Sequence, residues 1–166
     1  PLLITMDLEI AKDHNMEEQK TILEKISSDL NKLNLPLSVF LTSDSLDLFK
    51  NYIHKLNSPV NEFGIHGIDH GINENYKELD EEIIKTNIDY AFNNICNCLC
   101  RTPESFRGPF MSTSSRTQKV LTNKGIKSDF SVCSQRMDFM NSRGGDLRWL
   151  FSPRLPYHPS DKSPYR

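Results

Sequence analysis

Apolar residues along this chain recur with two spacings, one typical of buried strands and one typical of amphipathic helices. Short apolar runs predict strands at residues 2–8, 37–42, 62–65, 105–110, 128–134 and 147–151. Apolar positions at helical spacing, set among polar residues, predict helices at residues 16–34, 43–56, 79–99 and 112–123. The segment 152–166 contains too many prolines for regular structure.

Polar residues and glycine mark the ends of several of these helices. Ser43-Asp44-Ser45 is typical of an N-cap for the second helix, and Ser112–Ser115 of an N-cap for the fourth. Gly125 follows the fourth helix in the position where glycine commonly ends helices. Strands that alternate with helices imply parallel strands joined by right-handed crossovers. The chain is therefore predicted to form one α/β domain over residues 1–166, as an open sheet or a barrel.

The composition is typical of a globular protein, since 37% of the 166 residues are hydrophobic and 25% are charged. No apolar run approaches the roughly 20 residues needed to cross a bilayer, so we expect no membrane segment. The chain begins with Pro1 inside a predicted strand and without an initiator Met, as expected for a fragment or a processed product. Its four cysteines include no C-x-x-C pair, which favours buried thiols and a mildly reducing, cytoplasmic compartment.

The net charge of −2 hides an uneven distribution along the chain. Residues 1–100 carry 8 Lys/Arg and 17 Asp/Glu, whereas residues 101–166 carry 12 Lys/Arg and 5 Asp/Glu. Two interpretations remain open: the two parts attract each other within one fold, or the basic part attracts an anionic polymer. No helix-turn-helix or aromatic motif accompanies the basic residues, so we expect no nucleic-acid partner.

Polar side chains suited to metal chemistry follow three of the predicted strands. Asp7 and Glu9 stand at the end of the first strand, His66 and His70 follow the third, and Arg107 lies near the end of the next. Functional groups of parallel sheets collect at the carboxyl ends of the strands, so these side chains are expected to converge. An H-x-x-x-H pair within one helical turn would point both imidazoles the same way.

These residue types suffice for metal-assisted hydrolysis. Two imidazoles and one carboxylate can hold a divalent cation and leave one position for water. The other carboxylate can act as general base, and Arg107 can orient that base through a bidentate pair. The sequence therefore predicts a metal-dependent hydrolase.

Four segments, in this order, resemble the motifs of a known family, the NodB-type polysaccharide deacetylases (carbohydrate esterase family 4). T-M-D-L-E at 5–9 resembles the family's T-F-D-D-G motif, in a D-x-D/E form, and H-G-I-D-H at 66–70 resembles its H-x-x-x-H metal motif. R-G-P-F at 107–110 is similar to its R-x-P-F/Y motif, and K-G-I-K-S-D-F-S-V at 124–132 resembles the helix-to-strand segment that follows. The resemblance covers nearly the whole chain.

The resemblance implies a distorted (β/α) barrel of about seven strands, incomplete here at its C-terminus, and one divalent metal ion, usually zinc. It implies removal of N-acetyl groups from the amino sugars of a peptidoglycan-like, chitin-like or other N-acetylglucosamine-containing glycan. By position, Asp7 would be the base that Arg107 orients. The metal ligands would be Glu9, His66 and His70, and the backbone N–H of Phe110 would help to stabilise the oxyanion.

The chain departs from the family pattern in two places. The family's adjacent Asp-Asp is Asp7-Leu8 here, so either Glu9 replaces the second carboxylate as ligand or that ligand is lost. The family's late L-x-H strand, which supplies the general-acid histidine, is not found before Arg166. His158 is the sole histidine of the final third, but its surroundings, P-Y-H-P-S, do not match that motif.

Several other residues have both a functional and a structural interpretation. The side chains expected to contact substrate are those of Pro109, Trp149, Tyr157 and His158. The aromatic rings, including Phe151, can instead pack in the core. Asp69 is either a partner of a ligand imidazole or an exposed turn carboxylate, and Asp138 either reaches the site or caps a loop. His14 and His54 are expected to be solvated.

Two further functions remain as alternatives to a glycan deacetylase. A catalytically dead carbohydrate-binding module on the same barrel would explain the missing acid and the replaced carboxylate. A related barrel hydrolase of a small non-peptide amide would use the same metal chemistry. Neither the glycan, the identity of the metal nor the oligomeric state follows from the sequence.

Overall fold

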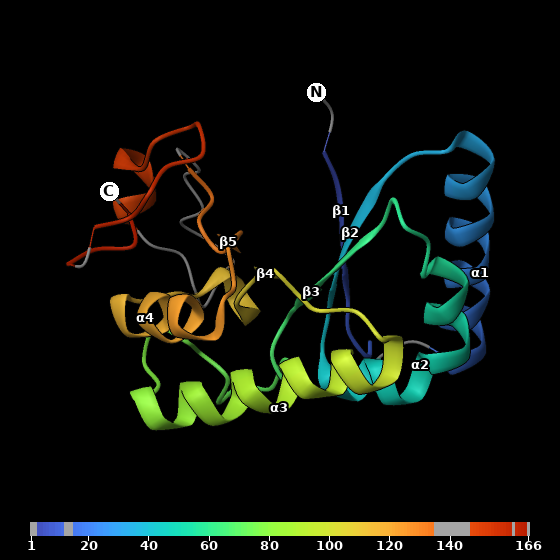
Figure 1. Ribbon diagram of the computed structural model, residues 1–166, viewed down its shortest axis with the longest axis horizontal. Helices are drawn as coiled ribbons and strands as arrows, with labels where there is room; N and C mark the ends of the chain where they lie inside the picture. The colour runs from blue at the N-terminus through green and yellow to red at the C-terminus, as the bar shows by residue number, and fades with distance from the viewer. Residues whose placement is uncertain (1–2, 12–14, 135–146, 161, 166) are drawn as a thin grey trace.

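The computed structural model describes residues 3–11, 15–134, 147–160 and 162–165 (Figure 1). Within these residues five strands alternate with four α-helices, and two short 3₁₀ helices lie between β4 and α4 and after β5. The elements are β1 (Ile4–Leu8), α1 (Met16–Leu33), β2 (Leu37–Leu41), α2 (Ser43–Leu56), β3 (Glu62–Ile65), α3 (Glu81–Leu99), β4 (Ser105–Phe106), η1 (Pro109–Met111), α4 (Ser115–Lys124), β5 (Ser128–Asp129) and η2 (Leu147–Phe151).

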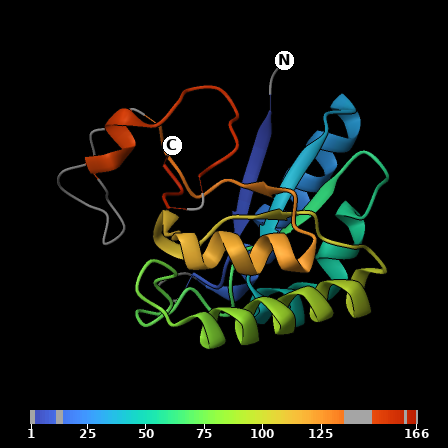
Figure 2. The same cartoon turned by 60° about the vertical axis from the view of Figure 1, so that its left-hand side comes forward.

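All five strands are parallel and stand in the sheet in the order in which they occur along the chain, β1-β2-β3-β4-β5. With right-handed crossovers, a sequential parallel order places every connecting helix on the same face of the sheet, as in the wall of a (β/α) barrel. The helices accordingly contact one another in chain order, with α3 between α2 and α4 (Figures 1 and 2). The predicted α/β class is confirmed, as an incomplete barrel wall.

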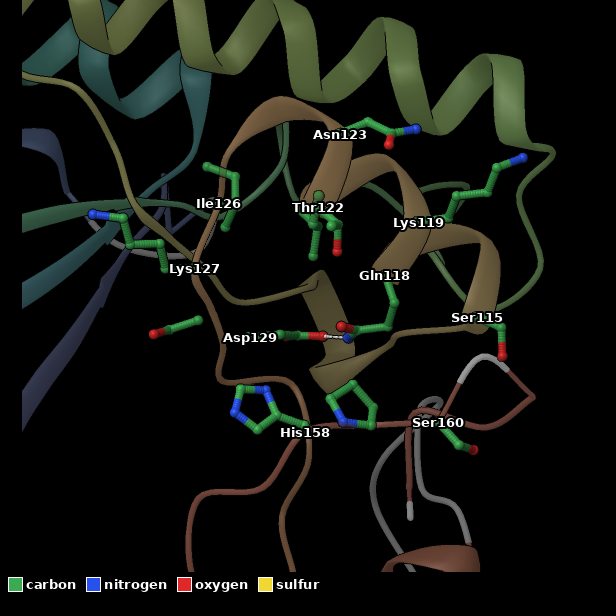
Figure 3. Close-up of a pocket in the computed structure, with 13 residues that line it drawn as sticks. Ser115, Gln118, Lys119, Thr122, Asn123, Ile126, Lys127, Asp129, His158 and Ser160 are labelled. Carbon is green, nitrogen blue, oxygen red and sulfur yellow. Dashed lines mark hydrogen bonds between the residues drawn. The ribbon is translucent and has the colours of Figure 1, made fainter.

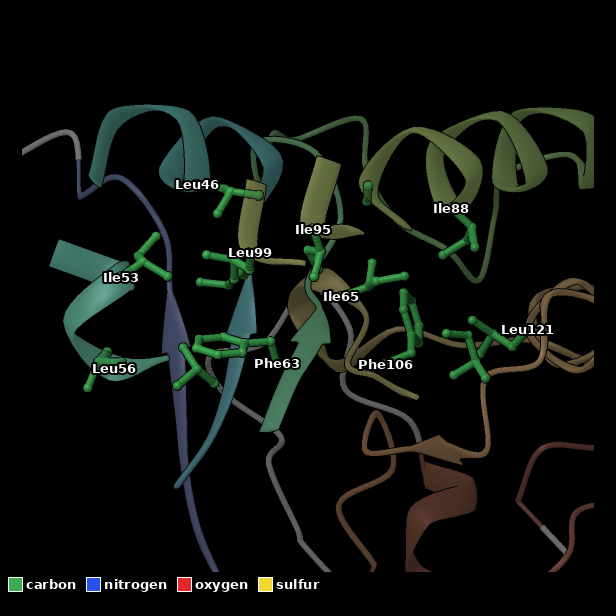
Figure 4. Close-up of a cluster of buried hydrophobic side chains, with 14 of the residues drawn as sticks. Leu46, Ile53, Leu56, Phe63, Ile65, Ile88, Ile95, Leu99, Phe106 and Leu121 are labelled. Carbon is green, nitrogen blue, oxygen red and sulfur yellow. The ribbon is translucent and has the colours of Figure 1, made fainter. Parts of the chain in front are cut away.

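The main hydrophobic core lies between the sheet and this layer of helices (Figure 4). Ile65 of β3 and Phe106 of β4 meet Ile88 and Ile95 of α3 there, and all four side chains are at most 1% exposed. Burial of this apolar surface is the principal force that fixes the helices against the strands.

The opposite face of the sheet carries the residues that lead to the polar site. Asp7, Phe40 and Gly64 stand side by side in the register of β1, β2 and β3. A Cβ at Gly64 would lie 2.7 Å from the Phe40 ring, so glycine provides the space that this ring occupies. Phe40 in turn packs against Phe130 with ring centroids 5.2 Å apart, and the Arg107 guanidinium lies 4.3 Å from the centroid of its ring.

Several predictions are corrected by the structure. The residues 147–151 form a 3₁₀ helix and not a strand, and the described residues contain five strands where about seven were expected. The fourth strand ends at Phe106, because the chain turns at Gly108. The N-cap of α2 is Thr42, whose side chain makes no capping bond. The first two N–H groups of α2, those of Ser43 and Asp44, donate to carbonyls of the loop after β3 instead.

Part of the unevenly distributed charge is paired within the fold. Three basic residues of α4 pair with acidic residues at or within α3: Lys119 with Glu81, Lys124 with Asp89, and Arg116 with Asp80. Pairs of this kind at the surface contribute at most about 1 kcal/mol each, and these three link the acidic part of the chain to the basic part. Among the described residues no helix combines the length and the apolar character needed to cross a membrane.

The core assignment is testable on a single helix. Ile88→Ala removes a side chain with no exposure and should lower the free energy of unfolding by about 2–5 kcal/mol, through lost burial and the cavity that remains. Ile83→Ala, at a position of α3 that is 47% exposed, should change it by less than about 0.5 kcal/mol. Urea unfolding of the two variants measures both values, and equal losses would contradict this packing.

Candidate functional site

The carboxyl end of β1 presents two acidic side chains from a firmly held backbone. The carbonyl of Leu8, between them, accepts the N–H of Thr42 at 3.2 Å and the hydroxyl of Ser45 at 2.8 Å. These two hydrogen bonds fix the backbone of residues 7–9 against the start of α2. Asp7 and Glu9 therefore project from the same end of the sheet, as the two-residue spacing predicted.

Asp7 forms the polar contact that joins β1 to the segment after β4. Arg107 Nη1 lies 2.5 Å from Asp7 Oδ1, and Arg107 Nη2 donates to the hydroxyl of Thr5 at 3.1 Å, so the predicted bidentate pair is not formed. The arginine side chain is 13% exposed and the aspartate side chain 33%. Because the guanidinium also lies over the Phe40 ring, it can orient the carboxylate, which stays partly open to solvent.

His66 directly follows β3 and is 2% exposed. Its Nδ1 lies 2.7 Å from the carbonyl oxygen of Arg107, and a carbonyl can only accept, so Nδ1 carries the proton. The lone pair is therefore on Nε2, which lies 3.9 Å from Asp7 Oδ2. Burial lowers the pKa of His66 and outweighs the opposing effect of the Asp7 carboxylate. The neutral imidazole, the form that binds metals, is favoured near pH 7.

His70 brings the second imidazole next to Glu9. Its Nδ1 lies 3.3 Å from Glu9 Oε2, and its Nε2 accepts the backbone N–H of Phe110 at 3.3 Å. The His66 and His70 ring centroids are 5.2 Å apart, and the Phe110 ring covers His70 at 4.4 Å. The two histidines thus converge on the Asp7–Glu9 segment.

The helical explanation for this convergence was wrong. The residues from His66 to Gly71 form an irregular loop and not a helical turn. Gly67 has φ +83° and His70 has φ +52°, so the chain twice adopts the left-handed conformation. The imidazoles meet because the loop folds back on itself, and the spacing of four residues has no helical meaning here.

A buried carboxylate that the sequence analysis did not single out holds this loop. Glu74 is 5% exposed and accepts the backbone N–H groups of Ile68 at 2.6 Å, Asp69 at 3.2 Å and His70 at 3.0 Å. Burial raises the pKa of Glu74, and these hydrogen bonds oppose the rise. In the sequence Glu74 stands in the polar run N-E-N, which looks like solvated surface, so no periodic signal revealed it.

The second loop of the site, R-G-P-F, is shaped by a close backbone approach. A Cβ at Gly108 would lie 1.9 Å from the carbonyl oxygen of Ser112, so only glycine fits. The N–H of Gly108 donates to the Ser131 hydroxyl at 2.7 Å, and that hydroxyl donates to the carboxylate of Asp129. Burial raises the pKa of Asp129, while bonds from its neighbours, including Thr113, lower it. A second inward-facing carboxylate therefore anchors this loop.

Glu9, His66 and His70 are suited to bind one divalent cation. Their donor atoms all lie within 4.8 Å of one another. Two neutral imidazoles and one carboxylate are a common zinc donor set, with metal–ligand distances of about 2.0–2.2 Å. Among the described residues, the ion pairs of Asp7 and Glu9 include one guanidinium, that of Arg107, so a cation would also balance the local charge. The donor set fits a metal ion, with Glu9 supplying the carboxylate.

The four residues expected to contact substrate lie in different surroundings. Pro109 is buried in η1, and the side chain of Trp149 is 2% exposed, so its ring offers no open face to a sugar in this structure. The Tyr157 hydroxyl donates to the carbonyl of Pro164 at 2.6 Å. His158 lines a pocket of about 480 Å³ beside α4 together with Asp129, and the candidate metal ligands do not line it (Figure 3).

Four other titratable candidates complete the description. Asp69 is exposed and accepts the N–H of Gly71 at 2.8 Å, so it closes a turn. His54 is exposed on α2, as expected. His14 and Asp138 lie outside the described residues.

Comparisons with known proteins add to this geometry. No family model matches the chain, and no curated protein matches its sequence. Among solved structures, it resembles a putative polysaccharide deacetylase from Mycobacterium smegmatis (TM-score 0.69, 16% identity, 78% of this chain and 50% of that one). It also resembles a family 4 carbohydrate esterase from Streptomyces lividans, solved with acetate (TM-score 0.60, 14% identity, 80% and 62%).

A third neighbour is a family 4 carbohydrate esterase pseudoenzyme from Bacillus anthracis (TM-score 0.63, 16% identity, 76% of this chain and 42% of that one). The chain thus spans about half the length of these neighbours. At such low identities the likeness establishes the fold, which is that of the polysaccharide deacetylases, part of the barrel being represented here.

The lowered pKa of His66 predicts how stability depends on pH. The unfolded chain takes up this proton near pH 6.5 and the folded chain only at lower pH, so the free energy of unfolding should fall as the pH drops below about 6.5. His66→Gln should remove that part of the slope, and His54→Gln should retain it. Urea unfolding of the metal-free proteins between about pH 7.5 and 5 measures the difference. An unaltered slope in His66→Gln would contradict the assignment.

Proposed function

We propose that this chain carries the reaction centre of a metal-dependent hydrolase that removes N-acetyl groups from the amino sugars of a polysaccharide. The observation that supports the proposal most is the convergence of the Asp7–Arg107 pair with Glu9, His66 and His70 at one end of the sheet. A fold shared with family 4 carbohydrate esterases supports the choice of an acetylated glycan as substrate.

Asp7 is the proposed general base. Its Oδ1 is held by Arg107, whereas its Oδ2 faces the site near His66 Nε2, and part of the carboxylate is open to solvent. A water molecule between Asp7 and the acetamide group would attack the carbonyl carbon and lose a proton to Asp7 Oδ2. Arg107 limits the movement of the carboxylate, so proton transfer would need little reorganisation.

Glu9, His66 and His70 would hold the cation. A divalent ion bound there supplies a Lewis acid, which polarises the amide carbonyl and makes a nearby water more acidic. His66 is prepared for this role because the Arg107 carbonyl fixes its proton on Nδ1 and leaves Nε2 available. The Phe110 N–H occupies His70 Nε2, so His70 would bind the cation through Nδ1, which already faces Glu9.

The proposed oxyanion donor is engaged in this structure. The backbone N–H of Phe110 donates to His70 Nε2, and Phe110 has φ +56°, so its peptide is held in an uncommon conformation. This N–H would serve the oxyanion only after exchanging the bond to His70 for one to the substrate. The loop that carries it is the part of the site whose contacts must change during turnover.

Metal binding can be tested with matched histidine variants. His70→Ala should weaken Zn²⁺ binding at least about 100-fold, because it removes one of three protein ligands, whereas His54→Ala on the exposed face of α2 should leave it unchanged. Competition with a chromophoric chelator measures the affinity of the metal-free chain. Equal affinities in the two variants would place the metal elsewhere.

The role of the base can be separated from metal binding. Asp7→Asn should lower acetate release from N-acetylglucosamine oligomers by about 100- to 10,000-fold, since amide oxygen is a poor proton acceptor, while Zn²⁺ affinity changes little. Asp47→Asn on the exposed part of α2 is the control. If Asp7→Asn turned over like the unchanged protein, Asp7 would not be the base.

A second candidate function is a carbohydrate-binding module without turnover. Among the described residues, His54 lies on α2 and His158 lines a different pocket, so no third histidine stands beside His66 and His70 to donate a proton to the leaving amine. One structural neighbour is described as a pseudoenzyme. Binding of N-acetylglucosamine oligomers by the metal-loaded chain, without acetate release, would favour this function.

A further inference from the structure

Glu74 is a buried carboxylate that the proposed reaction does not use. It takes part in no ion pair within the part of the chain that the structure describes. Among the described residues its carboxylate accepts hydrogen bonds from three successive backbone N–H groups and from the hydroxyl of Tyr76, at 3.1 Å. A buried carboxylate without a cationic partner is costly, so its presence calls for an explanation beyond packing.

The donors to Glu74 belong to the loop that carries the candidate ligands. The N–H groups of residues 68, 69 and 70 converge on its two oxygens, and the last of them is the N–H of His70 itself. From the other side, Ser43 and Asp44 at the start of α2 donate their N–H groups to the carbonyls of Gly67 and Ile68. The peptide planes of the loop are therefore fixed from both sides, and with them the direction of the His70 side chain.

Glu74 is also connected to the second loop of the site. Tyr76, which donates its hydroxyl to Glu74 Oε1, donates its backbone N–H to the Ser112 hydroxyl at 2.9 Å. That hydroxyl donates to the carbonyl of Pro109 at 2.6 Å, next to the Phe110 N–H that meets His70. A short chain of hydrogen bonds thus joins Glu74 to both segments that contact the His70 ring.

We propose that Glu74 is a positioning residue of the metal site, which sets the affinity for the cation by fixing the 66–70 loop against the 109–111 loop. The proposal rests on the metal-dependent function proposed above. Glu74 does not itself touch the ion. It acts through the backbone of its neighbours, so that the imidazoles meet Glu9 before the ion arrives and little binding energy is lost in ordering them.

Replacement by glutamine gives a sharp test because the shapes are the same. Oε1 accepts from Ile68 and Tyr76, and Oε2 accepts from Asp69 and His70, so each oxygen receives two donors. Glutamine replaces one oxygen by an NH₂ group, which cannot accept. In either orientation of the amide, the NH₂ group faces two of the four groups that donate to Glu74, so the loop must move. The matched control is Glu78→Gln, an exposed glutamate of the same connecting segment.

The experiment measures Zn²⁺ affinity by chelator competition and the visible spectrum of the Co²⁺-loaded chain, with thermal unfolding of the metal-free proteins alongside. Glu74→Gln should bind Zn²⁺ about 10- to 100-fold more weakly than the unchanged protein and alter the Co²⁺ absorption, as expected when the support of a metal ligand is lost. Glu78→Gln should match the unchanged protein in both.

Each other outcome is decisive. A folded Glu74→Gln with unaltered Zn²⁺ affinity and Co²⁺ spectrum, even with a lower melting temperature, would overturn the proposal, since the role would be structural only. If this variant does not fold, Tyr76→Phe removes one bond to Glu74 and should weaken Zn²⁺ binding by about 3- to 10-fold, with no change counting against the proposal. An unchanged protein that binds no metal would overturn the proposed function as well.

Discussion

The register of the parallel strands is the constraint on which the site depends. Asp7, Phe40 and Gly64 are paired in the register of β1, β2 and β3. The Phe40 ring lies beside Asp7, and it has room there because residue 64 has no side chain. Arg107, which follows β4, lies over this ring and reaches across the sheet to Asp7. A shift of one residue in any of these strands would turn the row to the other face and separate the pair.

The two loops beyond the strands are irregular, and each is held by a carboxylate that accepts several hydrogen bonds. Glu74 collects the N–H groups of the loop that bears His66 and His70, and Asp129 holds the R-G-P-F loop through Ser131. Irregular loops leave peptide groups without the partners that strands and helices provide, and carboxylates that accept several bonds satisfy them. The protein therefore fixes the shape of the site before any ligand binds. It also holds His70 and Phe110 at positive φ, a conformation that is unfavourable for these residues.

The sequence predicted the regular part of this arrangement well. Hydrophobic periodicity located the four helices and the first three strands to within a few residues, because those segments bury continuous apolar faces. It failed at residues 147–151, whose apolar run L-R-W-L-F is as typical of a strand as of the short 3₁₀ helix found there. Short runs of this kind carry no period long enough to decide.

The sequence predicted the candidate catalytic and metal-binding side chains of the site but not Glu74, the residue that holds their loop. Aspartate, paired histidines and arginine were found because strand ends meet in parallel sheets, and the structure does bring them together. The reason given for the histidine pair was wrong, since a loop and not a helix aligns them. Glu74 could not be recognised, because a glutamate between two asparagines differs from a surface residue only by contacts made after folding.

The central claim is that Glu9, His66 and His70 surround a single cation. The most direct measurement is an anomalous difference map from a crystal of the Zn²⁺-loaded protein, recorded at the zinc absorption edge. The account predicts one strong peak bonded to Glu9 and to both imidazoles, beside the Asp7–Arg107 pair. A peak elsewhere with none at these three side chains, or no peak from a crystal grown with zinc, would contradict it.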